Sequence, residues 1–367
     1  LLTYLDDVTV LFTQLEQALA ALEAAAALTA SEDAAGEAPF AVVAGRLSRM
    51  RGMGKVTFAD IGDQDGRLQL FVRKDAVGDG YALLDEIDLG DFLGASGTMM
   101  RTKTGEPSLA VTELTMLAKA MRPPPEKFHG LRDIEQRYRQ RYLDLISSRE
   151  VHETMRTRSR IVSAIRRFLD GRGFLEVDTP VLVPVPAGAM AQPFVTQHLA
   201  LDRQLYLRIA TELYLKRLIV GGMDKVYEIG RVFRNEGIDT SHNPEFTLLE
   251  LYHALGDLRT MMELTESLVS FLAKEITGDT KLSFGEKTID VTPPWPRKDF
   301  LELFKEKDID PANEEQLRGI LREKGVDTAG MDLTKMVDEV FGEVIEPDLQ
   351  DATFVTGQPI EMTPLCR

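Results

Sequence analysis

Three consecutive prolines, Pro123 to Pro125, place the strongest constraint on how this 367-residue chain can fold. Each proline ring fixes φ and removes a backbone N–H donor, so neither a helix nor a strand continues through the run. We therefore predict folded domains on both sides of a stiff linker at residues 122–132. The length suits two or three domains, and 44% apolar with 28% charged residues is typical of a soluble globular protein.

Residues 1–36 are rich in Ala and Leu at helical spacing and then break at Ser31, so we predict a leading helix and a linker. The apolar stretch Ala18–Ala30 contains Glu23 and is shorter than the about 20 apolar residues that span a bilayer. No charged segment precedes it, as a secretory signal would require, and Cys366 is the only cysteine. We expect a cytoplasmic protein without membrane contact, disulfide framework or cysteine-based zinc site.

Residues 37–121 change to short apolar runs separated by Gly and Asp, which is the pattern of a small β-barrel. The clearest runs are 41–47, 55–61, 67–72 and 109–114. A turn at Asp65-Gly66 would close residues 55–72 into a hairpin. This register places Ala59 and Ile61 opposite Val72 and Leu70 on the core face.

The other face of this predicted hairpin carries aromatic and polar side chains, namely Phe58, Asp60, Gln69, Phe71 and Arg73. Such a surface suits unstacked nucleic-acid bases, because each base stacked on an aromatic ring contributes about 1–3 kcal/mol. Alternatively, Phe58 and Phe71 pack beneath a loop or another domain. The residues alone leave both explanations open.

The charge is unevenly distributed. A formal net charge of −16 argues against indiscriminate nucleic-acid binding, which needs Lys and Arg at the contact surface. Residues 119–172, however, hold fourteen Lys or Arg and seven Asp or Glu. We predict two helices in this basic zone, at Asp133–Ile146 and Glu150–Asp170, followed by strands that alternate with helices to the end. The zone is either a nucleic-acid contact or a helical surface laced with ion pairs.

The segment Lys225–Tyr252 is typical of a strand, a long loop and a second strand. Period-two alternation divides the second strand into one face with Phe246, Leu248, Glu250 and Tyr252 and another with Glu245, Thr247, Leu249 and Leu251. Burial of Glu250 among apolar neighbours is costly unless a cation, such as a bound ammonium group, compensates it. Arg234 and His242 bracket the loop, where cations can meet phosphate oxygens, and Phe246 could stack on a purine. Taken singly, each residue also has an ordinary structural explanation.

This segment resembles motif 2 of the class II aminoacyl-tRNA synthetases in its lysine-specific form. The similar strings are Phe-Arg-Asn-Glu-Gly at 233–237, His-Asn-Pro-Glu-Phe-Thr at 242–247 and Glu-Leu-Tyr at 250–252. Residues 173–180 resemble motif 1, whose helix, strand and proline (here Pro180) form the family's dimer interface. Several long strings in the right order make coincidence remote.

Further blocks similar to lysyl-tRNA synthetases begin at Phe128, Arg137 and Leu205, and the resemblance runs from about Ala41 to Leu365. It implies an α+β multidomain chain with an N-terminal OB-fold β-barrel that binds the anticodon at residues 37–121. The class II catalytic domain, an antiparallel sheet flanked by helices, is then expected at 133–367. No class I signature, P-loop or Rossmann fingerprint occurs in the sequence.

The resemblance assigns roles at the nucleotide. Arg234 is expected to be the catalytic residue, in contact with both the α-phosphate of ATP and the lysine carboxylate. Glu236 and Phe246 are expected at the adenine, and His242 at the outer phosphates.

Roles at lysine and at RNA follow in the same way. The Gly188 backbone and Glu212 are expected to hold the α-amino group of lysine, and Glu250 with Tyr252 to line the side-chain pocket. In the barrel, the residues expected at the central anticodon base are Arg51, Phe58 and Gln69.

The implied reaction joins lysine to tRNA(Lys) at the expense of ATP. The lysine carboxylate attacks the α-phosphorus in line, pyrophosphate leaves, and the acyl group of lysyl-adenylate is transferred to the terminal ribose. Such chemistry needs alignment and charge neutralisation by Arg and Mg²⁺ and no Ser or Cys nucleophile. A homodimer through motif 1 is also implied.

The sequence departs from the family pattern in several places. Ala187 stands where a second Gly is usual, and Gln192 where an Arg is common. The block at Pro359–Leu365 resembles the one before the last catalytic segment, so motif 3 and the acidic metal ligands are not within this sequence. We expect a fragment that is inactive on its own.

Two other functions compete with this one. An aspartyl- or asparaginyl-tRNA synthetase shares the architecture but must pair a short polar side chain, which Glu250 with Tyr252 suits poorly. A synthetase-derived RNA-binding or interaction module without catalysis is the alternative from a different class. A paralogue that lysylates protein would typically lack the barrel.

Overall fold

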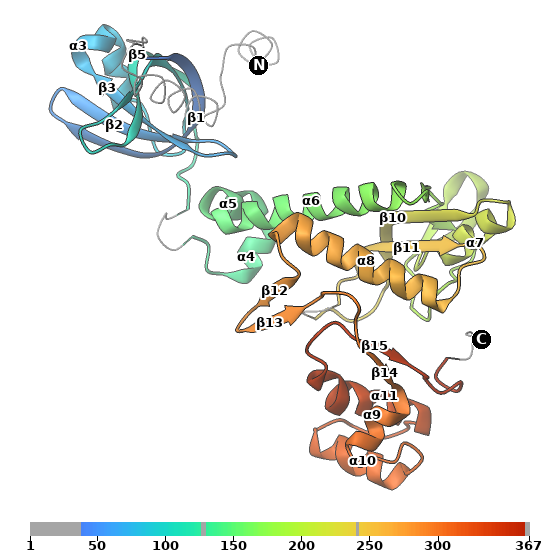
Figure 1. Cartoon of the computed structure of the whole chain (residues 1–367). Helices are drawn as coiled ribbons and strands as arrows, with labels where there is room; N and C mark the ends of the chain where they lie inside the picture. The colour runs from blue at the N-terminus through green and yellow to red at the C-terminus, as the bar shows by residue number, and fades with distance from the viewer. Residues whose placement is uncertain (1–37, 126–129, 240–241, 364–367) are drawn as a thin grey trace. The chain divides into compact units, whose positions relative to one another are not determined.

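The structure, a computed structural model, describes residues 38–125, 130–239 and 242–363 (Figure 1). The leading helix and linker predicted at residues 1–36 lie outside the described residues, as does Cys366. The chain divides into two compact units, residues 1–155 and 156–367, which are taken one at a time below. None of the helices in the three described ranges combines the length and the hydropathy that a membrane span requires.

The first unit contains the small β-barrel that the sequence predicted, closed and five-stranded, and its strand order is β1-β2-β3-β5-β4. The strands are β1 (Phe40–Met53), β2 (Val56–Gly62), β3 (Arg67–Arg73), β4 (Phe92–Arg101) and β5 (Pro107–Ala118). Two short helices, α3 (Lys74–Val77) and η1 (Gly78–Asp85), connect β3 to β4. The core is built from alternate strand positions, including Val43, Leu47, Ala59, Ile61, Leu68, Leu70, Val72, Leu93, Leu109 and Val111.

The β2–β3 hairpin forms, but its predicted register is wrong by two residues. Ala59 lies opposite Leu70 and Ile61 opposite Leu68, so the loop has four residues and not two. The reason is Asp63, whose side chain accepts hydrogen bonds from the backbone N–H groups of Asp65 and Gly66, both at 2.8 Å. Since strand side chains alternate with period two, a shift of two residues leaves the predicted core and outer faces unchanged.

The helix predicted at Asp133–Ile146 is two helices, α4 (Ile134–Arg139) and α5 (Arg141–Ser147), so that prediction is wrong in detail. The chain leaves helical geometry at Gln140, where φ is −117° and ψ is 53°. Asp144, only 2% exposed, pairs with Arg137 at 3.1 Å and Arg141 at 2.5 Å. The pair with Arg137 ties α4 to α5 across the break, whereas the pair with Arg141 lies within α5.

The second unit is built around a three-stranded sheet in the order β11-β10-β6. Its strands are β6 (Leu175–Glu176), β10 (Lys225–Phe233) and β11 (Glu245–His253), with β10 and β11 antiparallel. Two long helices, α6 (Arg149–Asp170) and α8 (Leu258–Thr277), run along β10 and β11 (Figure 1). The shared core includes Ile165, Phe168, Leu169, Tyr227, Leu249, Leu251, Leu264 and Leu268. The predicted helix at Glu150–Asp170 is thus confirmed.

Smaller elements surround this sheet. A second sheet, ordered β7-β9-β8, comprises β7 (Leu182–Val183), β8 (Val195–His198) and β9 (Arg203–Leu207). The turn η2 (Leu199–Leu201) joins β8 to β9, and α7 (Glu212–Val220) follows β9. The hairpin of β12 (Lys281–Phe284) and β13 (Lys287–Asp290) comes after α8.

The last described segment is a helical lobe, so the prediction that strands alternate with helices to the end is wrong here. The lobe comprises α9 (Phe300–Glu306), α10 (Glu314–Glu323), α11 (Leu333–Val340), η3 (Phe341–Ile345) and η4 (Glu346–Asp348). It has its own apolar core, which includes Phe304, Leu317, Leu321, Met336 and Val340. The parallel pair of β14 (Arg297–Asp299) and β15 (Phe354–Thr356) brings its two ends together.

Candidate functional site

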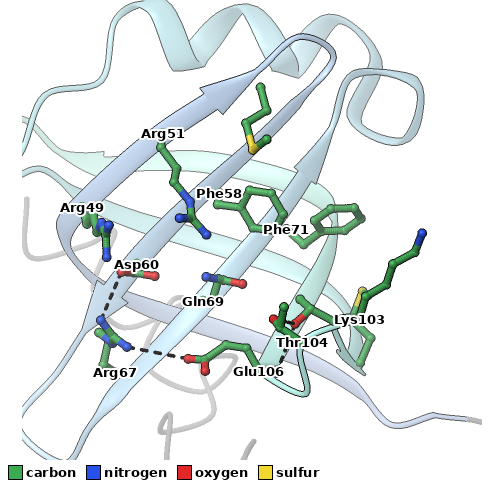
Figure 2. A pocket seen from close by; sticks show the side chains of 13 residues that line it. Arg49, Arg51, Phe58, Asp60, Arg67, Gln69, Phe71, Lys103, Thr104 and Glu106 are labelled. Atoms are coloured by element: carbon green, nitrogen blue, oxygen red, sulfur yellow. Dashed lines mark hydrogen bonds and ion pairs between the residues drawn. The ribbon is translucent and has the colours of Figure 1, made fainter.

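The outer face of the barrel is hollowed into a cavity of about 630 Å³ (Figure 2). Arg51, Phe58 and Gln69, the three residues expected at the anticodon, all line it. They come from β1, β2 and β3, whose outer positions the barrel brings side by side. The structure therefore gathers these residues into one concavity.

Two phenylalanines form the aromatic wall of this cavity. Phe58 and Phe71 are direct cross-strand partners, with ring centroids 5.3 Å apart and ring planes inclined by 48°. The Arg51 guanidinium carbon lies 5.2 Å from the centroid of the Phe58 ring. Within the barrel unit, both half-buried rings border the cavity. A flat base stacked on Phe58 would meet an aromatic ring and a cation together.

The polar wall is organised by ion pairs. Asp60 is buried and accepts from Arg67 at 3.2 Å, and the other guanidinium nitrogen of Arg67 lies 3.7 Å from Glu106, as Figure 2 shows. Arg49 and Lys103 also line the cavity, so its cations outnumber its anions. Sequence reasoning missed Lys103 and Glu106, because the loop between β4 and β5 reaches the cavity only through the non-local pairing of β3 with β5.

In the second unit, the strand, loop and strand predicted at Lys225–Tyr252 are confirmed as β10 and β11. Leu249 and Leu251 pack toward α6 and α8, as expected for the face of β11 that covers a core. Phe246, Glu250 and Tyr252 therefore occupy the opposite face. Their side chains are half-buried there.

The carboxylate of Glu250 is held at the start of α7. One oxygen accepts from the backbone N–H of Thr211 at 2.8 Å and from the Thr211 hydroxyl, and the other accepts from the Tyr252 hydroxyl at 3.3 Å. The positive end of the helix dipole favours a negative charge at this position. A carboxylate has about four acceptor positions, so three donors leave room for one more.

Tyr252 donates to this carboxylate, and Glu212 begins α7 directly after Thr211. The roles that the resemblance implied for Glu212, Gly188 and Tyr252 at lysine stay predictions. A side-chain carbon at Gly188, where φ is +89°, would lie 3.1 Å from the Glu212 Cβ, so the Gly188 backbone adjoins that glutamate. Burial, followed by the charges of Glu250 and Glu212, raises the pKa of the Tyr252 hydroxyl above its usual range. Tyr252 therefore stays neutral and remains a donor to Glu250. Sequence reasoning did not identify Thr211, since its contact with Glu250 joins distant parts of the chain.

Arg234 directly follows β10 and lies over Phe246, with 5.2 Å between its guanidinium carbon and the ring centroid. Its backbone N–H donates to Pro244 at 2.8 Å, which closes the base of the loop. Among the residues that the structure describes, the buried Arg234 Nε has no hydrogen-bond partner. An unsatisfied buried donor is costly, so this nitrogen points to an acceptor that a ligand would supply.

Glu236 and His242 are less organised. Both are exposed, and the His242 imidazole, 73% exposed, bonds through Nδ1 to Asp239 at 2.7 Å. No hydrogen bond or ion pair joins either side chain to Arg234 in the part of the chain that the structure describes. The structure thus brings Arg234 and Phe246 together, but it does not gather Glu236 and His242 around them. Gln192 stands where an Arg is common in the family, and its main-chain oxygen accepts from the backbone N–H of Asn235 at 2.8 Å.

A buried ion pair joins β10 to neighbouring segments of the second unit. Arg208 and Glu228, 4% and 3% exposed, form a salt bridge. Arg208 also donates to the Arg231 oxygen at 2.8 Å and to the Thr179 oxygen at 3.0 Å, and Glu228 accepts from the Thr179 backbone and hydroxyl. These bonds join β10 to the segment that carries exposed Pro180. Sequence reasoning missed both members of this pair.

Metal ligation is not prearranged in the described ranges, where no group of three or more His, Cys, Asp and Glu side chains could hold a metal ion. We therefore assign no residue of these ranges to a metal.

Comparison with known proteins settles the family. Residues 133–367 match the family described as tRNA synthetases class II (D, K and N), and residues 41–117 match the OB-fold nucleic acid binding domain. The first match alone covers more than half of the chain. The chain belongs to the class II tRNA synthetases. The predicted combination of an OB-fold barrel with a class II synthetase domain is thereby confirmed.

Two of the curated relatives that this class II synthetase chain resembles are lysine--tRNA ligases. The chain is 50% identical to the lysine--tRNA ligase of Dehalococcoides mccartyi (strain 195) over 331 residues. The matched region covers 89% of this chain and 66% of that protein. The lysine--tRNA ligase of Moorella thermoacetica is also 50% identical, over 89% of this chain and 68% of its own length. The chain thus spans about two thirds of the length of the curated relatives it matches.

Proposed function

We propose that this synthetase chain acts in lysine--tRNA ligation, in which ATP activates lysine to lysyl-adenylate and the lysyl group passes to tRNA(Lys). The names of its relatives support this choice within a family that also serves aspartate and asparagine. The observation that carries it is the Glu250 carboxylate, which accepts from three donors and has acceptor capacity for about one more. A lysine ε-ammonium would fill that place, whereas an aspartate side chain would be repelled.

The site residues act mainly by positioning. Glu250 and Tyr252 hold the ε-ammonium, while Glu212 and the Gly188 backbone hold the α-amino group. Arg234 then contacts both the lysine carboxylate and the α-phosphate, so the attacking oxygen and the phosphorus are brought into line. A new oxygen–phosphorus bond forms as pyrophosphate leaves, and a terminal ribose hydroxyl of tRNA later attacks the lysyl carbonyl and releases AMP.

The nucleotide would lie at the end of the hairpin. Phe246 and Glu236 contact the adenine, and His242 reaches the outer phosphates in this proposal. The buried Arg234 Nε, which has no hydrogen-bond partner in the described ranges, supports an anionic ligand at this place. Bound Mg²⁺ would supply further neutralisation of phosphate charge.

The first test is binding of lysine against norleucine, which has the same carbon skeleton without the ε-ammonium. Calorimetry on this chain should give lysine an affinity at least about 100-fold higher, because norleucine leaves the Glu250 charge without a cation. Equal affinities would contradict the proposal. A preference for aspartate or asparagine would favour the other branches of the family.

We further propose a cytoplasmic homodimer that forms through the motif 1 segment. Leu175, Val181, Leu182 and Val185 in and after this segment are 53%, 40%, 47% and 69% exposed. Exposed apolar residues that gather in one segment are typical of an interface. Pro180 lies among them and is itself exposed.

The barrel is proposed to bind the anticodon, with Phe58 as the stacking platform. Phe58→Ala should weaken binding of an RNA stem-loop that carries the tRNA(Lys) anticodon by about 1–3 kcal/mol, since one base loses its aromatic partner. Fluorescence anisotropy with the whole chain measures this loss. Phe40→Ala is the matched control, because Phe40 is exposed on the same barrel but does not line the cavity. Equal losses in both variants would refute the assignment.

A further inference from the structure

We propose that Ser108 is a positioning residue of the barrel cavity, one that orients the side-chain amide of Gln69 so that its NH₂ group faces the bound base. This inference rests on the proposed RNA-binding function of the barrel. The Ser108 side chain is 0% exposed, and its hydroxyl donates to Gln69 Oε1 at 3.1 Å. A buried hydroxyl therefore engages one end of an amide whose residue lines the cavity.

The barrel fixes this pair through its topology. Gln69 on β3 and Ser108 on β5 are register partners in the parallel pairing of these strands. Leu109, the next residue of β5, points into the barrel core, so Ser108 lies on the opposite, outer face together with Gln69. Because β3 and β5 are hydrogen-bonded neighbours in the barrel, the hydroxyl reaches the amide directly.

The orientation decides what the cavity can recognise. A glutamine amide presents an acceptor at one end and two donors at the other, and the ends are otherwise similar in shape. With Oε1 turned to Ser108, the NH₂ group remains for the cavity. Arg49 and Arg51, also in the lining, are donors only.

The acidic lining residues do not offset these donors. Asp60 accepts from Arg67 at 3.2 Å, and Glu106 lies 3.7 Å from the same guanidinium group. Figure 2 shows Arg67 between the two carboxylates, with Gln69 beside Asp60. The cavity thus suits a base edge with a carbonyl oxygen, such as O4 of uracil. It disfavours a base that places an amino group there, such as N4 of cytosine.

The hydroxyl has a second neighbour, the main-chain oxygen of Glu106 at 3.3 Å. If the Ser108 proton pointed there, the hydroxyl would accept from the Gln69 NH₂ group, and Oε1 would face the cavity. That reverse arrangement predicts the opposite preference, for cytosine over uracil. Base discrimination therefore tests the orientation directly.

The experiment uses the whole chain and two anticodon stem-loop RNAs that differ only in uracil or cytosine at the central loop position. The unsubstituted chain should prefer uracil by about tenfold or more. Ser108→Ala should reduce this uracil-to-cytosine ratio at least about fivefold, because the Gln69 amide is then able to rotate. Ser108→Cys, a weaker donor of similar size, should give an intermediate ratio.

Two controls separate positioning from general damage to the barrel. Thr112→Val removes another hydroxyl of β5, one that donates to the main-chain oxygen of Ser96 at 3.2 Å and does not line the cavity. This variant should leave the uracil-to-cytosine ratio unchanged. In a Gln69→Ala background, Ser108→Ala should change the ratio no further, because the group it positions is gone.

The outcomes are distinguishable. The role of Ser108 would be overturned, with RNA binding left in place, by any of three results. These are an unchanged uracil-to-cytosine ratio in Ser108→Ala, a preference of the unsubstituted chain for cytosine, or an effect of Ser108→Ala that is as large in the Gln69→Ala background as in the unsubstituted chain. If the unsubstituted chain bound neither stem-loop, the proposed function of the barrel would fail, and this inference with it.

Discussion

Glu250→Gln is expected to reduce lysine binding at least about 100-fold while the chain stays folded. The glutamine oxygen can still accept from the Thr211 N–H and hydroxyl, and its NH₂ group can donate to the Tyr252 oxygen, so the local hydrogen bonds persist. The negative charge that would hold the ε-ammonium is lost. Calorimetric titration with lysine measures the affinity, and thermal unfolding measures the stability.

Glu245→Gln provides the matched control, because Glu245 lies on the same strand but is exposed on its other face. It should bind lysine as the unsubstituted chain does. Near-normal lysine binding by Glu250→Gln would show that Glu250 serves only to cap the start of α7 through Thr211. A change in unfolding temperature without a change in affinity would support the same structural role.

Local patterns predicted much of the barrel, because strand periodicity depends on neighbouring residues. Ala59, Ile61, Leu70 and Val72 were placed in the core from alternation alone, and all four are buried. The register was missed because a side chain, Asp63, and not the turn dipeptide, sets the loop length. Alternation survives such an error, since its period is two.

The second unit shows where local patterns end. Alternation along β11 predicted which face covers the core, and the resemblance to class II synthetases suggested Glu212, Glu250 and Tyr252 as one pocket. No local signal marks Thr211, whose hydroxyl and N–H bind a carboxylate 39 residues further along the chain. The roles of these residues remain predictions that the binding measurements above address.

The Arg208–Glu228 pair was equally hidden in the sequence, because Glu228 lies within β10, Arg208 directly follows β9, and no local pattern links the two. The packing explains why Gly230 is a glycine, since a side-chain carbon there would clash with the Arg208 Nη2. The guanidinium therefore occupies the space over Gly230. This close fit implies that the pair holds β10 against the segment around Thr179.

Arg208→Met is accordingly expected to destabilise the second unit by about 3–5 kcal/mol, because it leaves the buried Glu228 charge without its cation. Thr179 still donates to Glu228, but neutral donors do not replace a guanidinium. Urea unfolding followed by the fluorescence of Trp295, the single tryptophan of the chain, reports on this unit. Arg208→Met combined with Glu228→Gln should recover part of the loss, since no buried charge then remains unpaired.

Arg166→Met is the control for the loss of an arginine as such. Arg166 pairs with Glu176 at 2.9 Å, but both side chains are substantially exposed, so the pair contributes about 0–1 kcal/mol. The two arginine variants should therefore differ by several fold in their effect on the free energy of unfolding. Equal effects would mean that the Arg208–Glu228 pair stabilises the fold no more than an exposed ion pair does.

Arg208 joins Thr179 to β10 through its own hydrogen bonds and through those of Glu228. Its removal should therefore also loosen the segment beside Pro180, where we propose that the two subunits meet.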